Sequence, residues 1–92
     1  MKKTWIKIKR GLLDPKHIEK LGQAWYLYFY ILDQAEWETG TITDWKDQYA
    51  ADDLNKPIAL IREHRKHLQD GKYIRTEQGL HKQTITIHNW IN

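Results

Sequence analysis

Residues 16–37 carry the feature that most constrains the fold of this chain, a helical stripe of bulky apolar side chains. The stripe recurs at spacings of three and four residues, as one face of an α-helix does, at Ile18, Leu21, Trp25, Tyr28, Leu32 and Ala35. Ala24, Leu27 and Ile31 widen it. A stripe this broad predicts one long central helix from Lys16 to about Trp37, packed on more than one side and with Trp25 in the core.

Length and composition indicate one small globular domain, residues 1–92. The chain is 40% hydrophobic, has five Trp and five Tyr, and has no Cys, which excludes disulfide scaffolds and Cys nucleophiles. No apolar run is long enough to span a membrane, and the first ten residues lack the apolar segment of a signal peptide. We expect a cytoplasmic protein without a membrane partner.

Four shorter segments predict strands. Alternating apolar and cationic residues predict a half-buried strand over residues 5–10, and residues 41–43 predict a short strand segment. Near the end of the chain, residues 73–76 and 82–87 read as two strands joined by a hairpin through the polar stretch 77–79. Trp5 and Trp90 are expected to close the core together.

Two further helices are predicted between the second strand and the hairpin. Asp44 is placed to cap the first, with Trp45 and Tyr49 as inward anchors. Asn55 is placed to cap the second, which ends before Gly71.

The succession of these elements predicts a fold class. Two helices joined by a tight turn and followed by a β-hairpin are the outline of a winged helix-turn-helix. The short strand before the two helices is expected to join the hairpin. We therefore predict a mainly α fold with a small antiparallel β-sheet, of the winged helix-turn-helix type.

The last predicted helix separates an apolar side from a polar side. Ile58, Ile61 and Leu68 share the apolar side. The polar strip suits a DNA major groove, because Arg can fork onto guanine, Lys can meet guanine or phosphate, and Glu can accept from cytosine. Its members are Lys56, Ala59, Arg62, Glu63, Lys66 and His67. The alternative is an ordinary solvated helix face.

The predicted hairpin adds cations that would follow phosphates or enter a minor groove, namely Lys72, Arg75 and Lys82. Charge is distributed in blocks: residues 21–55 have a net charge of −6, whereas residues 1–20 and 56–92 have net charges of +5 and +4. This pattern indicates one positive face for a polyanion such as double-stranded DNA, although blocky solvated surface would look the same.

Catalytic and metal-binding motifs are missing from the sequence. There is no glycine-rich phosphate loop, nucleophile elbow or zinc-protease motif. His64 and His67 stand three residues apart without a companion ligand, so we expect both to be solvated or to face a groove. We predict a protein that is not an enzyme and that holds no cofactor or metal.

Several segments also resemble a known family. They are Trp5-Ile6-Lys7-Ile8-Lys9, followed by Leu12-Leu13, Ile18 and Leu21, then Gly40-Thr41-Ile42, Leu68 to Ile74, and Ile85-Thr86-Ile87-His88-Asn89-Trp90. In these the sequence resembles the N-terminal winged-helix domains of phage and plasmid replication proteins, the replication-initiator or replisome-organiser type. The resemblance implies binding to origin DNA by the N-terminal part of a longer protein. The helix predicted to begin at Asp44 departs from the family because it is acidic. Its carboxylates would repel phosphate, namely Asp44, Asp47, Asp52 and Asp53.

The sequence therefore predicts sequence-specific binding of double-stranded DNA at a replication origin. One alternative is a transcription regulator of the same fold. The other is an assembly module with little DNA affinity, which self-associates through the N-terminal strand and central helix or contacts other replication proteins.

Overall fold

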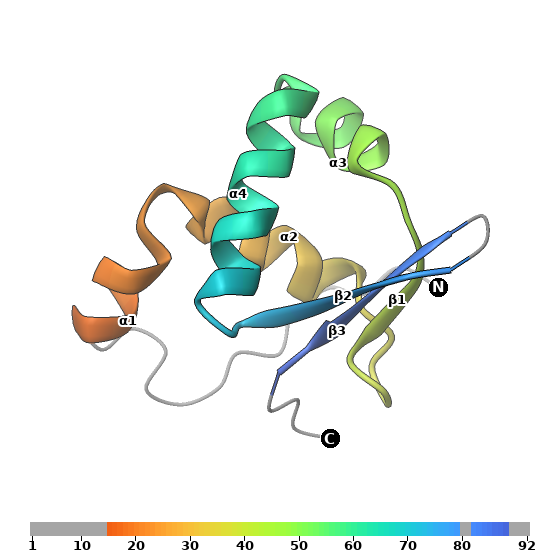
Figure 1. Ribbon diagram of the computed structural model, residues 1–92, viewed down its shortest axis with the longest axis horizontal. Coiled ribbons are helices and arrows are strands. Elements are labelled where there is room, and N and C mark those ends of the chain that lie inside the picture. Colours follow the sequence, from red (N-terminus) through yellow and green to blue (C-terminus); the bar gives the residue numbers. More distant parts are fainter. Residues whose placement is uncertain (1–14, 80–81, 89–92) are drawn as a thin grey trace.

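The computed structural model describes residues 15–79 and 82–88, so the expected first strand, Trp5 and Trp90 lie outside the described residues. The elements follow in the order α1 (Pro15–Leu21), the short 3₁₀ helix η1 (Gly22–Ala24), α2 (Trp25–Gln34), β1 (Thr41–Trp45), α3 (Asp47–Leu54), α4 (Ile58–Asp70), β2 (Ile74–Gln78) and β3 (Gln83–Ile87). Helices dominate, and the three strands form one small sheet beside them (Figure 1). Within the described ranges, no helix combines the length and apolar character needed to cross a membrane.

The prediction of one long helix over residues 16–37 is wrong, because the helix breaks at Gly22. Gly22 has φ +54°, a left-handed conformation that glycine adopts freely and that an α-helix excludes. α1 and α2 are therefore separate helices joined by a 3₁₀ turn. The break takes Ile18 and Trp25 out of the common stripe, and both side chains are more than half exposed instead of lying in the core.

α3 and α4 form the predicted helix pair, with different ends. α3 begins at Asp47, because Asp44 belongs to β1 and does not cap the helix. Asn55 ends α3 with φ +53°, so it is not the cap of α4, which begins at Ile58. Tyr49, predicted to anchor α3 inward, is 47% exposed.

The sheet has the predicted topology. β2 and β3 form an antiparallel hairpin, and β1 pairs with β3 on its other edge. Ile74, Ile85 and Ile87 are buried, and Ile74 pairs directly with Ile87. The alternate positions, Arg75 and Glu77, are exposed, as expected for a sheet with one buried face.

A β-bulge in β1 decides where its last two side chains point. Ile42 pairs with Ile85 and Trp45 pairs with Gln83, so β1 has one residue more than β3 over this stretch. Regular alternation would place Asp44 on the same side as Ile42 and Trp45 on the opposite side. With the extra residue, Trp45 is 3% exposed in the core and Asp44 is exposed.

The core lies between α2, α4 and the sheet. Its largest fully buried side chains are Leu27 and Ile31 from α2, Ile61 and Leu68 from α4, and Ile85 from β3. Burying each of them contributes about 1.5–3 kcal/mol. The described residues therefore form a mainly helical fold with a small three-stranded antiparallel sheet, and their element order is compatible with a winged helix-turn-helix in which α4 is the helix before the hairpin.

Candidate nucleic-acid interface

α4 presents the polar strip to solvent. Ile61, His64 and Leu68 are buried along its opposite side. All the strip residues chosen from the sequence are exposed, namely Lys56, Ala59, Arg62, Glu63, Lys66 and His67. Lys56, however, precedes α4 and is not part of the helix as predicted. The 3.6-residue period of an amphipathic helix accounts for this agreement, because it assigns each residue to a side without knowledge of the partner elements.

The prediction that His64 is solvated or faces a groove is wrong. The His64 side chain is buried against α2, with Nδ1 2.5 Å from the Tyr26 hydroxyl oxygen. Burial lowers the pKa of His64 below its ordinary 6.5; Glu63 opposes this change, and the charges of His67 and Lys56 add to it. His64 therefore contributes a neutral contact between α4 and α2.

Two strip residues are engaged at the edge of α4 that faces α1 and α2. The His67 ring donates from Nε2 to the backbone oxygen of Lys20 over 2.7 Å, since a carbonyl oxygen only accepts. The Lys56 ammonium lies 5.2 Å from the centroid of the Tyr26 ring, within cation–π range. Both side chains stay exposed, but neither lines the groove between α4 and the hairpin.

A groove separates α4 from the hairpin. It encloses about 290 Å³ between Ile58 and Arg62 of α4, residues 45–48, and the hairpin residues Gln78, Lys82 and Gln83. Arg62 and Lys82, which are distant in sequence, therefore line one opening, and Lys46 adds a third cation. Lys46 could not be recognised from the sequence, because the residues around it do not indicate a groove that only the tertiary fold creates.

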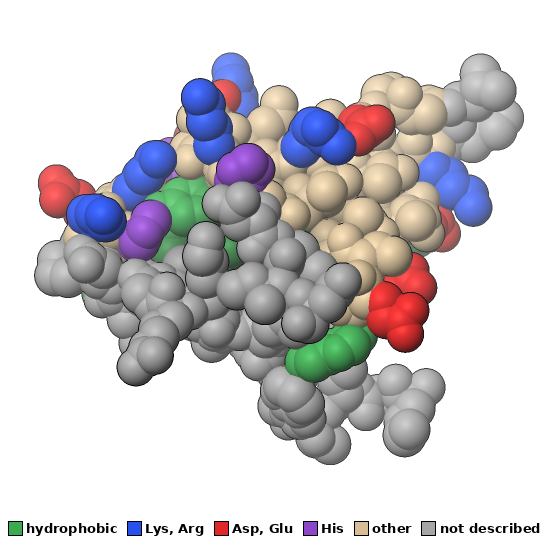
Figure 2. Space-filling view, turned by 90° about the horizontal axis from the view of Figure 1, so that it is seen from below, with side chains coloured by type: hydrophobic (Ala, Val, Ile, Leu, Met, Phe, Trp, Pro, Cys, Tyr) green, Lys and Arg blue, Asp and Glu red, His purple; other side chains and the backbone are tan. Residues whose placement is uncertain are grey.

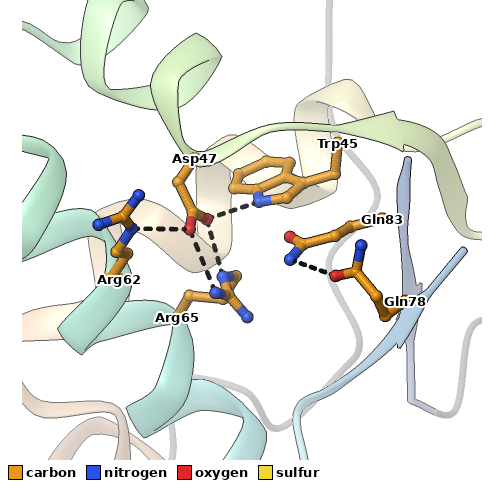
Figure 3. A network of polar contacts seen from close by, with 6 residues as sticks. All are labelled: Trp45, Asp47, Arg62, Arg65, Gln78 and Gln83. Carbon is orange, nitrogen blue, oxygen red and sulfur yellow. Dashed lines mark hydrogen bonds and ion pairs between the residues drawn. The ribbon is translucent and has the colours of Figure 1, made fainter. Parts of the chain in front are cut away.

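Asp47, the first residue of α3, organises the floor of this groove (Figure 3). Its carboxylate accepts two hydrogen bonds from Arg65, at 2.8 and 3.1 Å, and one from the Trp45 indole at 2.8 Å. Arg62 Nε lies 3.6 Å from the same carboxylate. Burial raises the pKa of Asp47, but the hydrogen bonds from Arg65 and Trp45 and the charges of Arg65 and Arg62 outweigh it, so the pKa is lowered.

This network reduces the repulsion of phosphate that was expected from the acidic residues in and before α3. Asp47 is the carboxylate that lines the groove, and it is neutralised by arginine. Asp44, Asp52 and Asp53 line a different hollow, between α2, β1 and α3. Figure 2 shows Lys and Arg side chains spread over the upper half of one face, with the largest acidic group at its right-hand side.

Arg75 and Lys72 lie apart from the groove. Both line a hollow of about 440 Å³ at the base of the hairpin, together with Gln69, Ile74, Thr86, Ile87 and His88. Arg75 is paired with Glu77 at 3.2 Å, and both side chains are largely exposed. The alternation from buried Ile74 could have placed Arg75 on the other face of the sheet. The structure thus brings Lys82, but not Arg75 or Lys72, beside Arg62.

No family model matches the chain, and no curated protein or solved structure matches it either. Among residues 15–79 and 82–88, no three His, Asp or Glu side chains come together in a way that could hold a metal ion.

Proposed function

We propose that this chain binds double-stranded DNA, with the exposed side of α4 in the major groove and the hairpin along the phosphate backbone. The observation that carries the proposal is the groove in which Arg62, Lys46 and Lys82 meet, beside a solvent-facing helix in the recognition position. Phosphates attract such a cluster, and base edges are read by the side chains between them.

Arg62 is well placed to read a base. Its side chain is 63% exposed, and Asp47 contacts it through Nε at the long distance of 3.6 Å. In Figure 3 the two terminal nitrogens of Arg62 point away from Asp47. Asp47 thus holds the guanidinium at the groove while its fork remains open, the geometry that a bidentate contact to guanine O6 and N7 requires.

Lys66 extends the same surface. Lys66 lies one helical turn beyond Arg62, about 6 Å along the axis, and is exposed beside Ala59 and Glu63. The small side chain of Ala59 permits a close approach of the helix, and Glu63 can accept a hydrogen bond from a cytosine amino group. Lys82, at the tip of the hairpin, serves as a backbone contact that carries no sequence information.

The biological target proposed is a replication origin, bound by a replication initiator. This part of the proposal rests on the resemblance to phage and plasmid replication proteins. A transcription regulator would use the same helix and hairpin, so footprinting on the natural site separates the two roles.

One structural observation favours the assembly alternative. Ile18 and Trp25 expose 53% and 54% of their surface on α1 and at the start of α2. Exposed apolar side chains of this size are common at interfaces between protein chains. Light scattering of the full chain, with and without duplex, shows whether it self-associates and whether DNA changes its state.

The proposal is tested by measuring duplex affinity as a function of salt. With about five phosphates neutralised, the logarithm of the affinity should fall with the logarithm of salt concentration at a slope of about −4 to −5. Arg62→Ala should cost about 1–3 kcal/mol and relax sequence preference, whereas Lys82→Ala should weaken all sequences alike. Arg75→Ala, which removes a hairpin cation away from the groove, is the matched control and should have the smallest effect. A slope near zero would refute DNA binding.

A further inference from the structure

A second hollow, with opposite chemistry, lies between α2, β1 and α3. It encloses about 280 Å³ and has three aromatic side chains in its wall, Tyr30, Trp45 and Tyr49. Ile42 and Gln34 complete the wall, and three carboxylates stand around it, Asp44, Asp52 and Asp53. Trp45 is the residue that this hollow shares with the α4–hairpin groove.

Among the residues that the structure describes, no cation pairs with the carboxylates of this hollow. Asp53 accepts a hydrogen bond from the Tyr30 hydroxyl at 2.6 Å, and Asp52 accepts one from the Gln48 amide at 2.8 Å. Both donors are neutral. Asp44 has no hydrogen-bond or ion-pair partner among the residues that the structure describes. Three unneutralised charges therefore face one small aromatic space.

The pKa of the Tyr30 hydroxyl reflects both burial and the nearby carboxylates. Its pKa is raised, first by burial, then by the hydrogen bond to Asp53 and by the charges of Asp53 and Asp33. Lys46 is two residues from Asp44 in the sequence, and it lines the α4–hairpin groove and not this hollow. Its ammonium lies 5.6 Å from the centroid of the Tyr49 ring. The Tyr49 ring is thus already within reach of a cation.

The shape and chemistry of the hollow select an organic cation. Aromatic faces attract ammonium and guanidinium groups, and carboxylates form charge-assisted hydrogen bonds with them. The described carboxylates are not grouped closely enough to hold a metal ion. A volume of about 280 Å³ lies at the lower edge of the roughly 300–1,000 Å³ of small-molecule sites, so it suits one long side chain better than a whole ligand.

We propose that this hollow docks a basic segment of a partner protein, with one Arg or Lys side chain entering between Tyr30 and Tyr49 toward the three carboxylates. Charge complementarity selects the partner, since a positively charged peptide is the chemistry that such a rim attracts. The hollow and the α4–hairpin groove have Trp45 in common in their linings, so they are adjoining but separate openings. The proposal does not depend on DNA binding.

The test is a titration of the full chain with a short Arg- and Lys-containing peptide, followed by calorimetry and by amide chemical shifts. The comparison peptide has Gln in place of every Arg and Lys. The basic peptide should bind and shift the amides of Asp44, Tyr49 and Asp53, while the Gln peptide should not bind. No binding of the basic peptide, or shifts confined to other elements, would overturn the proposal.

Variants locate the site and control for folding. Tyr49→Ala should weaken the peptide about fivefold, whereas Tyr49→Phe, which keeps the ring, should retain its affinity. Asp52→Asn should also weaken it, while Arg62→Ala, on the groove, should leave it unchanged. Thermal unfolding verifies that each variant is folded. Equal affinities for Tyr49→Ala and the unsubstituted chain would contradict the assignment.

Two other occupants are distinguished in the same series. Spermidine offers amine groups without a polypeptide; if it binds as tightly as the peptide and displaces it, a protein partner is refuted. Sedimentation of the chain alone addresses a second copy as occupant. Self-association that disappears in Tyr49→Ala would replace the separate partner by another copy of this chain and overturn the proposal as stated.

Discussion

The two ends of α3 carry the same residue type with opposite electrostatic outcomes. Asp47, at the start, is bound by the guanidinium of Arg65 and lies near that of Arg62, and its side chain is only 9% exposed. Asp52 and Asp53, near the end, receive hydrogen bonds from neutral donors. One helix therefore contributes an ion-paired carboxylate to a cationic groove and two carboxylates without a cationic partner among the described residues to the other hollow. The acidity of a segment therefore does not define the surface that it borders, because residues from other elements decide which of its carboxylates are ion-paired.

Of the substitutions at the two ends of α3, removal of the arginine that pairs with Asp47 should lower the stability of the fold most. Arg65→Met should destabilise the fold by about 2–3 kcal/mol, because it leaves a mostly buried carboxylate without its two strongest hydrogen bonds. Arg62→Met, at an exposed and longer contact, should cost less than about 1 kcal/mol. Urea unfolding measures both. Equal losses would show that Arg65 has no special role at the start of α3.

Acid should expose the same difference. The folded-state pKa of Asp47 is lowered from 3.8, so its contribution to stability is present above about pH 4 and is lost as pH falls through the lowered value. We expect the urea midpoint of the chain to drop in this range, and Asp47→Asn to remove much of that drop. Asp52→Asn, at the other end of α3, is the matched surface substitution. A profile that Asp47→Asn does not alter would contradict the paired state of Asp47.

A separate, milder response is expected from the buried contact on the other side of α4. Because burial lowers the folded-state pKa of His64 below 6.5, the unfolded chain binds its proton more readily, and stability should decline as pH falls below about 6.5. His64→Gln, whose side chain can still reach the Tyr26 hydroxyl, should flatten the stability curve between pH 7 and pH 5. If both curves decline alike, the titration does not arise from His64.

The smallest effects are expected at the acidic end of α3. Asp53→Asn should change stability by less than about 1 kcal/mol, because the hydrogen bond from Tyr30 is exposed. Asp52→Asn should stay within about 0.5 kcal/mol, since its partner is also exposed. Urea unfolding at neutral pH checks both. A loss as large as that of Arg65→Met would mean that the end of α3 is as tightly built as its start.

The parts of the fold that depend on local periodicity could be predicted from the sequence. The sides of α4 follow from the 3.6-residue spacing of Ile61 and Leu68, and the hairpin follows from two alternating segments around a polar turn. β1, the strand that joins the hairpin, could be predicted from its place between two helices in the element order.

The missed features depend on single backbone conformations or on contacts across the fold. An isolated glycine such as Gly22 is often tolerated inside a helical pattern, so its left-handed φ could not be read from the stripe. Trp45 is buried, as expected for an inward anchor, but it belongs to β1 and not to the predicted helix. The bulge that turns it inward has no marker in the sequence of β1. The pairing of Asp47 with Arg65 joins two helices, and the groove that contains Arg62 and Lys82 exists only once the hairpin packs beside α4.

Binding of duplex DNA through α4 and the hairpin is tested by titrating the full chain with duplex DNA. Amide chemical shifts at two salt concentrations follow the titration residue by residue. The largest changes should fall at Arg62, Lys66 and Lys82, with weaker binding at the higher salt and no change at Asp52 or Asp53. Unchanged amides along α4, or the largest changes at the acidic end of α3, would contradict the account.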